Sequence, residues 1–347
     1  MKTVLKVMLV LLGLPTAAIA LFFVWASAGT TAEQTYADVV DYGTEAAAPK
    51  DSYTIVSYNI GYLSGLANNT TTRPEQSFFD ANQQQAIAAL ASVTPDIVGF
   101  QEIDIAARRS YDINQVEAIA QALGMSAGAI AINWDKNYLP FPYWPPAAHF
   151  GKILSGQAIL SRYPIENNRR VVLERVAKPF FYNAFYLDRL AQVSEIRLGD
   201  RVIIVISVHL EAFEETTRVS QTQFVRQLAE DYAKTYPVIV MGDFNSAINR
   251  PTFVTATGET YGEQQFSIKE MLASEQLAPV LPVAEWPTEV VAEGGNNTAT
   301  FPSDEPAYKL DYLFYTPSTI EVVETQVMTS AAQASDHLPL MMRFRLK

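Results

Sequence analysis

Apolar runs and helical patterns alternate along the chain from about residue 53 onward. The runs are rich in β-branched and aromatic residues, as strands are, and they cover 53–60, 95–104, 155–165, 191–198, 202–210, 238–241, 308–315, 320–328 and 341–346. Helical spacing of apolar residues covers 77–92, 112–123 and 217–235, and Asp112 is the expected N-cap of the second helix. Strands that alternate with helices, and later with hairpins, predict a two-sheet α/β layered domain with helices outside.

Two stretches interrupt this pattern. Residues 133–150 combine prolines, aromatic side chains and His149, and the prolines predict a loop. This loop either packs over its own domain or offers a surface to lipid or to an apolar substrate group. Residues 250–305 have no clear period and are expected to be mostly loop. His149 belongs to no motif, so we expect a structural role for it.

The amino-terminal segment is apolar and uncharged from residue 7 to residue 32, and Lys2 and Lys6 precede this run. Its length fits a single transmembrane helix, here residues 1–28, and the basic residues on its short side place the remaining chain outside the cytoplasm. The alternative is a cleaved signal peptide, because 26–28 resemble a small-x-small cleavage site and the domain would then be secreted. Residues 29–51 are small and polar, which predicts a linker to a domain over 52–347.

The composition excludes some chemistry and disfavours one class of partner. The 347 residues include no cysteine, so disulfides, thiolate metal ligands and a cysteine nucleophile are excluded. The formal net charge is −12, and an acidic surface repels a polyanion. Nucleic acid is therefore disfavoured as a partner without being excluded, and no protein partner is inferred.

The most informative stretch is 237–246. A buried-type strand over 238–241 breaks abruptly into Gly242, Asp243, Phe244 and Asn245. Asp243 and Asn245 are two residues apart, so both side chains lie on one side of the chain. A carboxylate beside a carboxamide suits a phosphate and a metal ion. The alternative is an ordinary turn after a core strand, because Asp and Asn are common in turns.

Further polar residues stand at or near strand ends, or inside strands that should otherwise be apolar: Asn59, Glu102, His209, Asp243, Asn245, Asp311, Asp336 and His337. A single site at one edge of the sheets would explain all of them. Carboxylates such as Glu102 and Asp336 suit a hard divalent cation. A histidine oriented by Asp311 could act as a base, and uncharged donors such as Asn59 and Asn245 could hold phosphate oxygens.

The motifs that carry these residues resemble, in order and spacing, those of the endonuclease/exonuclease/phosphatase superfamily, also called deoxyribonuclease I-like. They are SYNIG, GFQEID, ILSRYPI, SVHLEAF, MGDFNS, KLDYLFY and SDHLPL, spread over roughly 52–347. The resemblance implies a four-layered α/β sandwich, with two packed mixed β-sheets flanked by helices, and Mg²⁺-dependent phosphoester hydrolysis. Mn²⁺ and Ca²⁺ are alternatives to Mg²⁺. Gly61 stands where some nucleases of this superfamily carry an acid.

The resemblance also implies roles for individual residues. The implied metal ligands are Glu102, Asp336 and Asn59, and the implied substrate-binding residues are Arg189 and Asn59. The implied catalytic group is His337, His209, Asp243, Asn245 and Asp311. Within it, His337 is expected to take a proton from water and Asp311 to orient His337.

Three functions remain open on the sequence. The leading prediction is a membrane-anchored phosphodiesterase or phosphatase that acts on a lipid head group, an inositol phosphate or another small phosphoester. The second is an extracytoplasmic nuclease. The third is a catalytically inactive member that binds a phospholigand or a protein.

Overall fold

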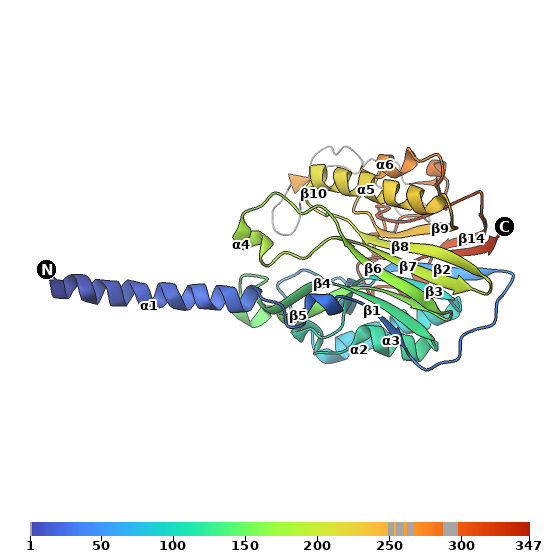
Figure 1. Ribbon diagram of the computed structural model, residues 1–347. Helices are drawn as coiled ribbons and strands as arrows, with labels where there is room; N and C mark the ends of the chain where they lie inside the picture. The colour runs from blue at the N-terminus through green and yellow to red at the C-terminus, as the bar shows by residue number, and fades with distance from the viewer. Residues whose placement is uncertain (1, 249–252, 255–259, 262–266, 287–297) are drawn as a thin grey trace.

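The computed structural model describes residues 2–248, 253–254, 260–261, 267–286 and 298–347. Two β-sheets pack face to face, and helices cover the outer face of each (Figure 1). The predicted layered α/β architecture, with two mixed sheets flanked by helices, is confirmed.

The first sheet has the strand order β1-β4-β5-β3-β2-β15-β14. Its strands are β1 (Ala37–Asp41), β2 (Tyr53–Asn59), β3 (Ile97–Asp104), β4 (Ala127–Leu139), β5 (Gly151–Ser161), β14 (Ile320–Val327) and β15 (Leu340–Leu346). Strands β2 and β3 are parallel, and the other neighbours are antiparallel.

The second sheet has the order β12-β13-β9-β8-β7-β6. Its strands are β6 (Ile165–Val172), β7 (Leu190–Leu198), β8 (Arg201–His209), β9 (Val238–Asp243), β12 (Ala278–Pro279) and β13 (Asp311–Tyr315). Here β8 and β9 are the parallel pair, and α5 (Glu215–Ala233) connects them. Two further strands, β10 (Phe253–Val254) and β11 (Thr260–Tyr261), pair with each other.

Helices and apolar side chains complete the layers. Helices α2 (Gln76–Ser92) and α3 (Gln115–Leu123) lie on the first sheet, and α5 and α6 (Ile268–Leu272) lie on the second (Figure 1). One buried cluster joins the two sheets and α5, and a second joins the first sheet to α2 and α3. A short helix, α4 (Phe180–Asn183), lies in the connection between β6 and β7.

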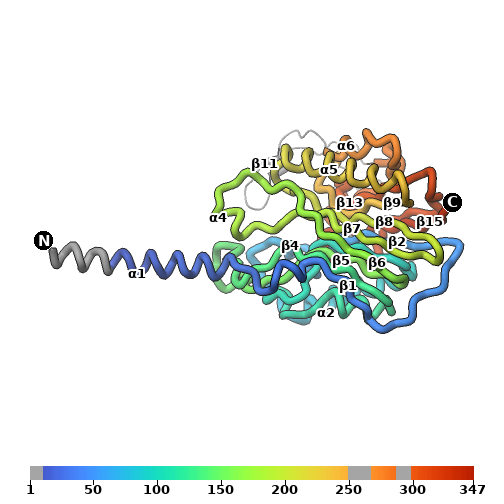
Figure 2. The backbone as a smooth tube through the Cα atoms, viewed as in Figure 1, coloured from blue at the N-terminus to red at the C-terminus, as the bar shows by residue number. Residues whose placement is uncertain are grey.

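The amino-terminal helix α1 (Lys2–Ser27) projects away from the sandwich (Figure 2). Within the described part of the chain, no helix has both the length and the apolarity that a membrane crossing requires. The anchor expected over 1–28 remains a prediction.

Part of the expected linker is built into the sheet. Strand β1 lies inside 29–51 and pairs with β4, with Ala37 opposite Ala131. The carboxylate of Asp135 accepts hydrogen bonds from the backbone amides of Thr30 and Thr31, at 2.7 and 2.9 Å. Backbone pairing and these side-chain contacts therefore fix a segment whose composition alone indicated a free linker.

Two other expectations were wrong in detail. Residues 133–139 belong to β4 rather than to a loop, because the prolines begin only after Leu139 and the backbone before them pairs with β5. Helix α3 begins at Gln115 and is capped by Asn114, whose side chain accepts from the amide of Glu117. Asp112 instead has a positive φ of 57°. Much of 250–305, expected to be loop, lies outside the described residues.

The glycine that precedes Asp243 is required by close strand packing. Gly242 has φ = 138°, and a Cβ there would lie 1.9 Å from the carbonyl oxygen of Val208 on the neighbouring parallel strand. A contact this short with backbone cannot be relieved by a rotamer change.

Gly242→Ala should therefore lower the free energy of unfolding by roughly 3 kcal/mol, as overpacking does when the backbone must move. Urea denaturation measures this loss. The matched control is Gly124→Ala, where φ is +62° but nothing lies within 4 Å of the new Cβ; backbone strain alone should cost about 1 kcal/mol there. Equal losses in the two variants would show that strand packing does not restrict position 242.

Candidate active site

The predicted site residues meet where strand ends of the two sheets lie next to each other. His209 is the last residue of β8, and Asp243 is the last residue of β9. The parallel register places these two residues opposite each other, and Asp311 at the start of β13 lies opposite Asp243 on the other side. Asn59 ends β2 in the first sheet, and its side-chain amide donates to Asp243 Oδ2 at 3.0 Å across the two sheets.

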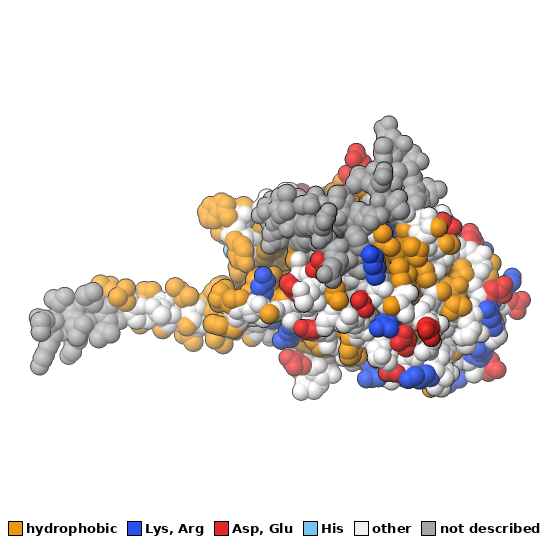
Figure 3. Space-filling view, turned by 90° about the horizontal axis from the view of Figure 1, so that it is seen from above, with side chains coloured by type: hydrophobic (Ala, Val, Ile, Leu, Met, Phe, Trp, Pro, Cys, Tyr) orange, Lys and Arg blue, Asp and Glu red, His pale blue; other side chains and the backbone are white. Residues whose placement is uncertain are grey.

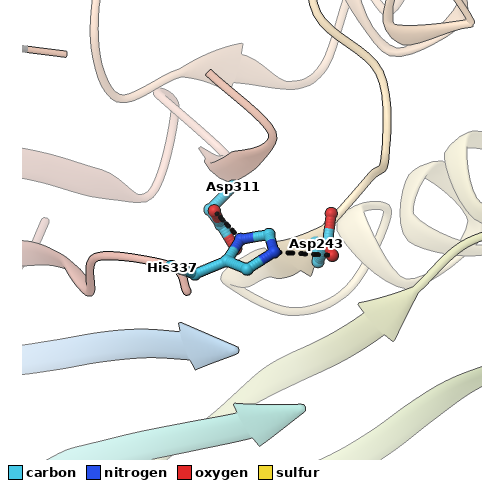
Figure 4. A group of neighbouring side chains, drawn as sticks. All are labelled: Asp243, Asp311 and His337. Atoms are coloured by element: carbon cyan, nitrogen blue, oxygen red, sulfur yellow. Dashed lines mark hydrogen bonds and ion pairs between the residues drawn. The ribbon is translucent and has the colours of Figure 1, made fainter. Parts of the chain in front are cut away.

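Asp311, His337 and Asp243 form a linear arrangement (Figure 4). The carboxylate of Asp311 lies 2.9 Å from His337 Nδ1, and His337 Nε2 points toward Asp243 Oδ2 at 3.8 Å. All three side chains are buried. The bond to Asp311 fixes the ring orientation and leaves Nε2 directed at the second carboxylate.

His209 lies between two acids and an arginine. Its Nε2 is 3.7 Å from Glu102 Oε1 and 3.7 Å from Asp243 Oδ2. The guanidinium of Arg189 lies 2.7 Å from the same nitrogen. A donor at this distance favours the tautomer with an unprotonated Nε2.

The carboxylates of Glu102 and Asp336 lie close together. The side-chain amide of Asn68 donates to Glu102 Oε2 at 3.0 Å and lies 3.3 Å from Asp336 Oδ2. Burial raises the pKa of Glu102 to about 7, and the charge of Asp336 adds to this rise. Burial also raises the pKa of Asp336. Glu102 sits at an irregularity in the pairing of β3 with β5 and has φ = 52°, a rare conformation that is held at functional sites.

Gly61 explains one departure from the superfamily pattern. It has φ = 52°, and a Cβ at this position would lie 2.7 Å from Asp336 Oδ1 and 2.8 Å from Ser335 Oγ. An acidic side chain here would occupy the space that Asp336 fills. In this chain Asp336 is therefore the carboxylate beside Glu102.

The two asparagines are held by the protein itself. Asn59 Oδ1 accepts from the amide of Gly61 at 3.1 Å, while its amide nitrogen is bound to Asp243. Asn245 has φ = 49°, and its side-chain amide donates to the carbonyl of Leu210 at 3.0 Å. Both lie beside Asp243, and their contacts to substrate or metal remain predictions.

Arg189 lies in the site, but its guanidinium is already bound by other side chains of the protein. Besides His209, it contacts Glu211 Oε2 at 3.4 Å and the hydroxyl of Tyr186 at 3.3 Å, and it is buried. As the chain is folded, Arg189 positions His209, and its predicted contact with substrate remains untested. His149, which we expected to be structural, lies elsewhere, bonded to the hydroxyl of Tyr138 at 2.8 Å.

The charges of the two histidines differ because their neighbours differ. Burial lowers the pKa of His337, but the charges of Asp311 and Asp243 outweigh it and raise this pKa to about 10. Burial, followed by the charge of Arg189, holds the pKa of His209 well below its usual value. Burial raises the pKa of Asp243 to about 6 against the opposing charge of His337. At neutral pH the metal-free site thus holds a charged His337 and a neutral His209.

Three residues of this site were not predicted from the sequence. Asn68 lies in a polar loop and carries no signal that distinguishes it from other loop residues. Glu211 is buried and follows His209 by two residues, so strand alternation could have identified it. Ser335 Oγ donates to the carbonyl of Asn59 at 2.8 Å, and it stands directly before Asp336 in a motif that had been noted.

Comparison with protein-family models identifies the family. The model of the Endonuclease/Exonuclease/phosphatase family matches residues 56–337, which is most of the chain. The chain belongs to the endonuclease/exonuclease/phosphatase family. Members of this family hydrolyse phosphoesters as nucleases or phosphatases, typically with a divalent metal ion.

Individual proteins that resemble this chain share only modest sequence identity with it. A UPF0294 protein of Vibrio cholerae serotype O1 is 32% identical over 161 residues, which is 46% of each chain. The match thus spans about half the length of this curated relative. Among solved structures, an endonuclease/exonuclease/phosphatase from Beutenbergia cavernae is 18% identical with a TM-score of 0.56, covering 86% of this chain and 72% of that one. The catalytic domain of human Nocturnin with bound sulfate is 17% identical with a TM-score of 0.55, covering 92% and 100%. These structures share the fold.

The residues of this endonuclease/exonuclease/phosphatase domain fit a divalent cation. Glu102 and Asp336 are half-buried acids that share the side-chain amide of Asn68, and the charge of Asp336 raises the pKa of Glu102. Carboxylate oxygens in this setting suit a hard cation such as Mg²⁺. Asp243, Asp311 and His337 also bring ligand atoms within 4.8 Å of one another. In that group, however, Asp311 already holds His337 Nδ1, so the pair Glu102 and Asp336 is the better cation site.

Nuclear magnetic resonance titration of the metal-free protein should show His337 doubly protonated at pH 7 and losing its proton near pH 10, while His209 is neutral at pH 7. Because the folded-state pKa of His337 is raised, its charge stabilises the fold below the unfolded value of about 6.5. That contribution is lost as the pH rises through about 10. Asp311→Asn should lower the pKa of His337 by about 1–3 units. A His337 signal that titrates near 6.5 in the unaltered chain would contradict this electrostatic description.

Gly61→Ala should weaken Mn²⁺ binding about tenfold to a hundredfold, because the new methyl group displaces the Asp336 carboxylate. Isothermal titration calorimetry measures the dissociation constant. Gly43→Ala is the control, since its φ of +72° is comparable and nothing lies within 4 Å of the added Cβ. Unchanged Mn²⁺ affinity in Gly61→Ala would remove Asp336 from the set of metal ligands.

Proposed function

We propose that this protein is a membrane-anchored, metal-dependent phosphoester hydrolase that acts on a lipid head group or another small phosphoester outside the cytoplasm. The observation that carries the chemistry is the arrangement of Asp311, His337 and Asp243 beside the paired acids Glu102 and Asp336. A proton-accepting group beside acids that suit a divalent cation supports hydrolysis at phosphorus.

The side chains of the site have different roles in the proposed reaction. Asp311 holds the ring of His337, and Asp243 Oδ2 faces its Nε2 at 3.8 Å, so a water between them can be oriented by both groups. The water oxygen attacks phosphorus, its proton passes to the His337 and Asp243 pair, and the phosphorus–oxygen bond to the leaving group breaks. Asn59 and His209, which flank Asp243, lie where phosphoryl oxygens would be held.

Glu102 and Asp336, with Asn59 nearby, would hold the divalent cation. Bound there, it would supply positive charge that neutralises the developing charge on the phosphoryl oxygens and favours an unprotonated His337.

The net charge of −12 and the amino-terminal helix support a lipid or small-molecule substrate over polymeric DNA. An extracytoplasmic nuclease is the second candidate, since a structural relative, D. rerio TDP2, has been solved in complex with single strand DNA product, at 13% identity and a TM-score of 0.54. A catalytically inactive binding protein is the third, and the complete set of acids and histidines in the site weighs against it.

His337→Ala and Asp243→Asn should each reduce turnover by about 10²–10⁴-fold, because each removes a group that positions or accepts the proton of the attacking water. The assay compares Mg²⁺ with chelator on phospholipid, nucleotide and DNA substrates. His149→Ala, altered outside the site, is the control and should retain full activity.

The substrate screen also separates the three functions. A nuclease would prefer DNA, with rates that fall steeply as salt rises. Absence of turnover on every substrate would favour the inactive binding protein. Near-normal metal-dependent activity of His337→Ala would contradict the proposed mechanism.

A further inference from the structure

Aromatic side chains are exposed around the carboxyl end of helix α1, which we call its foot. We call this surface the aromatic collar and define it as Phe22, Trp25, Tyr143, Trp144, Phe180 and Phe181, whose exposed fractions run from 49% to 77%. Figure 3 shows apolar side chains along the described part of α1 and at its junction with the domain. Large aromatic residues seldom remain this exposed on a surface that contacts only water.

Contacts fix the helix to the domain at the collar. The ring of Tyr138, at the end of β4, lies 5.8 Å from Phe22 and 6.4 Å from Trp25. On the other side, Phe23 lies 5.4 Å from Phe185 and 6.0 Å from Phe180.

Backbone groups at the end of α1 are also held. The side-chain amide of Asn137 donates to the carbonyl of Trp25 at 3.1 Å, and the amine of Lys136 donates to that of Ser27 at 3.1 Å. The foot of the helix is therefore attached to the same strand and loops that carry the collar.

The strand directions place the collar on the catalytic edge. Strands β3 and β4 are each antiparallel to β5, so the carboxyl end of β4, which leads to Tyr143 and Trp144, lies on the edge of Glu102. Strands β6 and β8 are each antiparallel to β7, so the connection after β6, which carries Phe180, leaves from the edge of His209.

The helix joins this same edge. Strand β1 follows α1 and runs antiparallel to β4, so the chain before β1 runs toward the carboxyl end of β4, where the amide of Asn137 donates to the carbonyl of Ala28. Helix α1, the collar loops and the catalytic residues therefore share one edge of the sandwich.

The exposed apolar side chains of α1 indicate what surrounds this edge of the sandwich. Its described residues expose large apolar side chains at Leu11, Leu12, Leu14, Ile19, Leu21 and Val24, each at 65% or more, and these positions lie on all sides of the helix. The chain carries no charge from residue 7 to residue 32. A groove on a protein partner would cover one stripe, whereas an all-round apolar surface calls for an apolar surrounding such as lipid acyl chains. Exposed Trp and Tyr at the foot match the aromatic belt of a membrane–water interface.

We propose that the aromatic collar rests in the interface of a lipid bilayer and holds the catalytic edge toward it, so that the substrate is a phosphoester presented at the lipid surface. The docking stands on the collar and α1 alone, and only its catalytic consequence rests on the proposed hydrolase function. Substrate from the bilayer would reach Glu102, Asp243 and His337 without leaving the membrane surface.

The absence of cysteine allows a direct test with single-cysteine variants of the full chain. Tyr143→Cys and Phe180→Cys probe the collar, at positions 76% and 77% exposed. Val323→Cys on β14, 43% exposed, and Phe224→Cys on α5, 48% exposed, are the controls. Each variant carries an environment-sensitive fluorophore and is reconstituted into phosphatidylcholine vesicles, with and without bromine on the acyl chains.

Brominated lipid should quench the collar fluorophores at least about fivefold more than the control fluorophores, because only the collar lies within the interface. Equal quenching at all four positions, or none at the collar, would overturn the proposal.

Each labelled variant is also assayed with bis(p-nitrophenyl) phosphate and Mg²⁺. Collar quenching without hydrolysis would sustain the docking and refute the hydrolase, whereas hydrolysis without collar quenching would refute the docking and sustain the hydrolase.

Discussion

Burial of several acids in one place is the constraint on which the rest of this structure depends. Asp243 and Asp311 are buried, Glu102 and Asp336 are half-buried beside them, and an isolated buried carboxylate costs roughly several kcal/mol even after relaxation. Hydrogen bonds from Asn59 and Asn68 and the charge of His337 offset part of that cost. What remains is negative potential at Glu102 and Asp336, where a divalent cation is the natural complement.

The sandwich is arranged so that this concentration of charge can exist. Parallel pairing of β8 with β9 places His209 opposite Asp243, and close packing of these strands leaves room only for glycine at position 242. The rare backbone conformations at Glu102 and Asn245 turn their side chains out of the regular strand pattern. The surrounding sheets hold these conformations in place, which is why strained positions and functional positions coincide.

The sequence predicted most strands of the sandwich, the layered fold and the convergence of the site, because apolar periodicity is strong and an acid inside an apolar run is unusual without a function. It did not predict Asn68, since a loop asparagine looks the same whether or not it bridges two carboxylates. It did not predict β1, β4 or β6 as strands, because pairing partners far along the chain determine all three. The engagement of Arg189 by Glu211 and Tyr186 depends likewise on tertiary contacts that composition does not show.

The central claim is that Glu102 and Asp336 form the cation site and that Asp243 and His337 act beside it. Anomalous diffraction from crystals soaked in Mn²⁺ tests this most directly. We expect a peak bound by the carboxylates of Glu102 and Asp336, next to Asn59. A sole peak between Asp243, Asp311 and His337, or no peak in this region at saturating Mn²⁺, would contradict it.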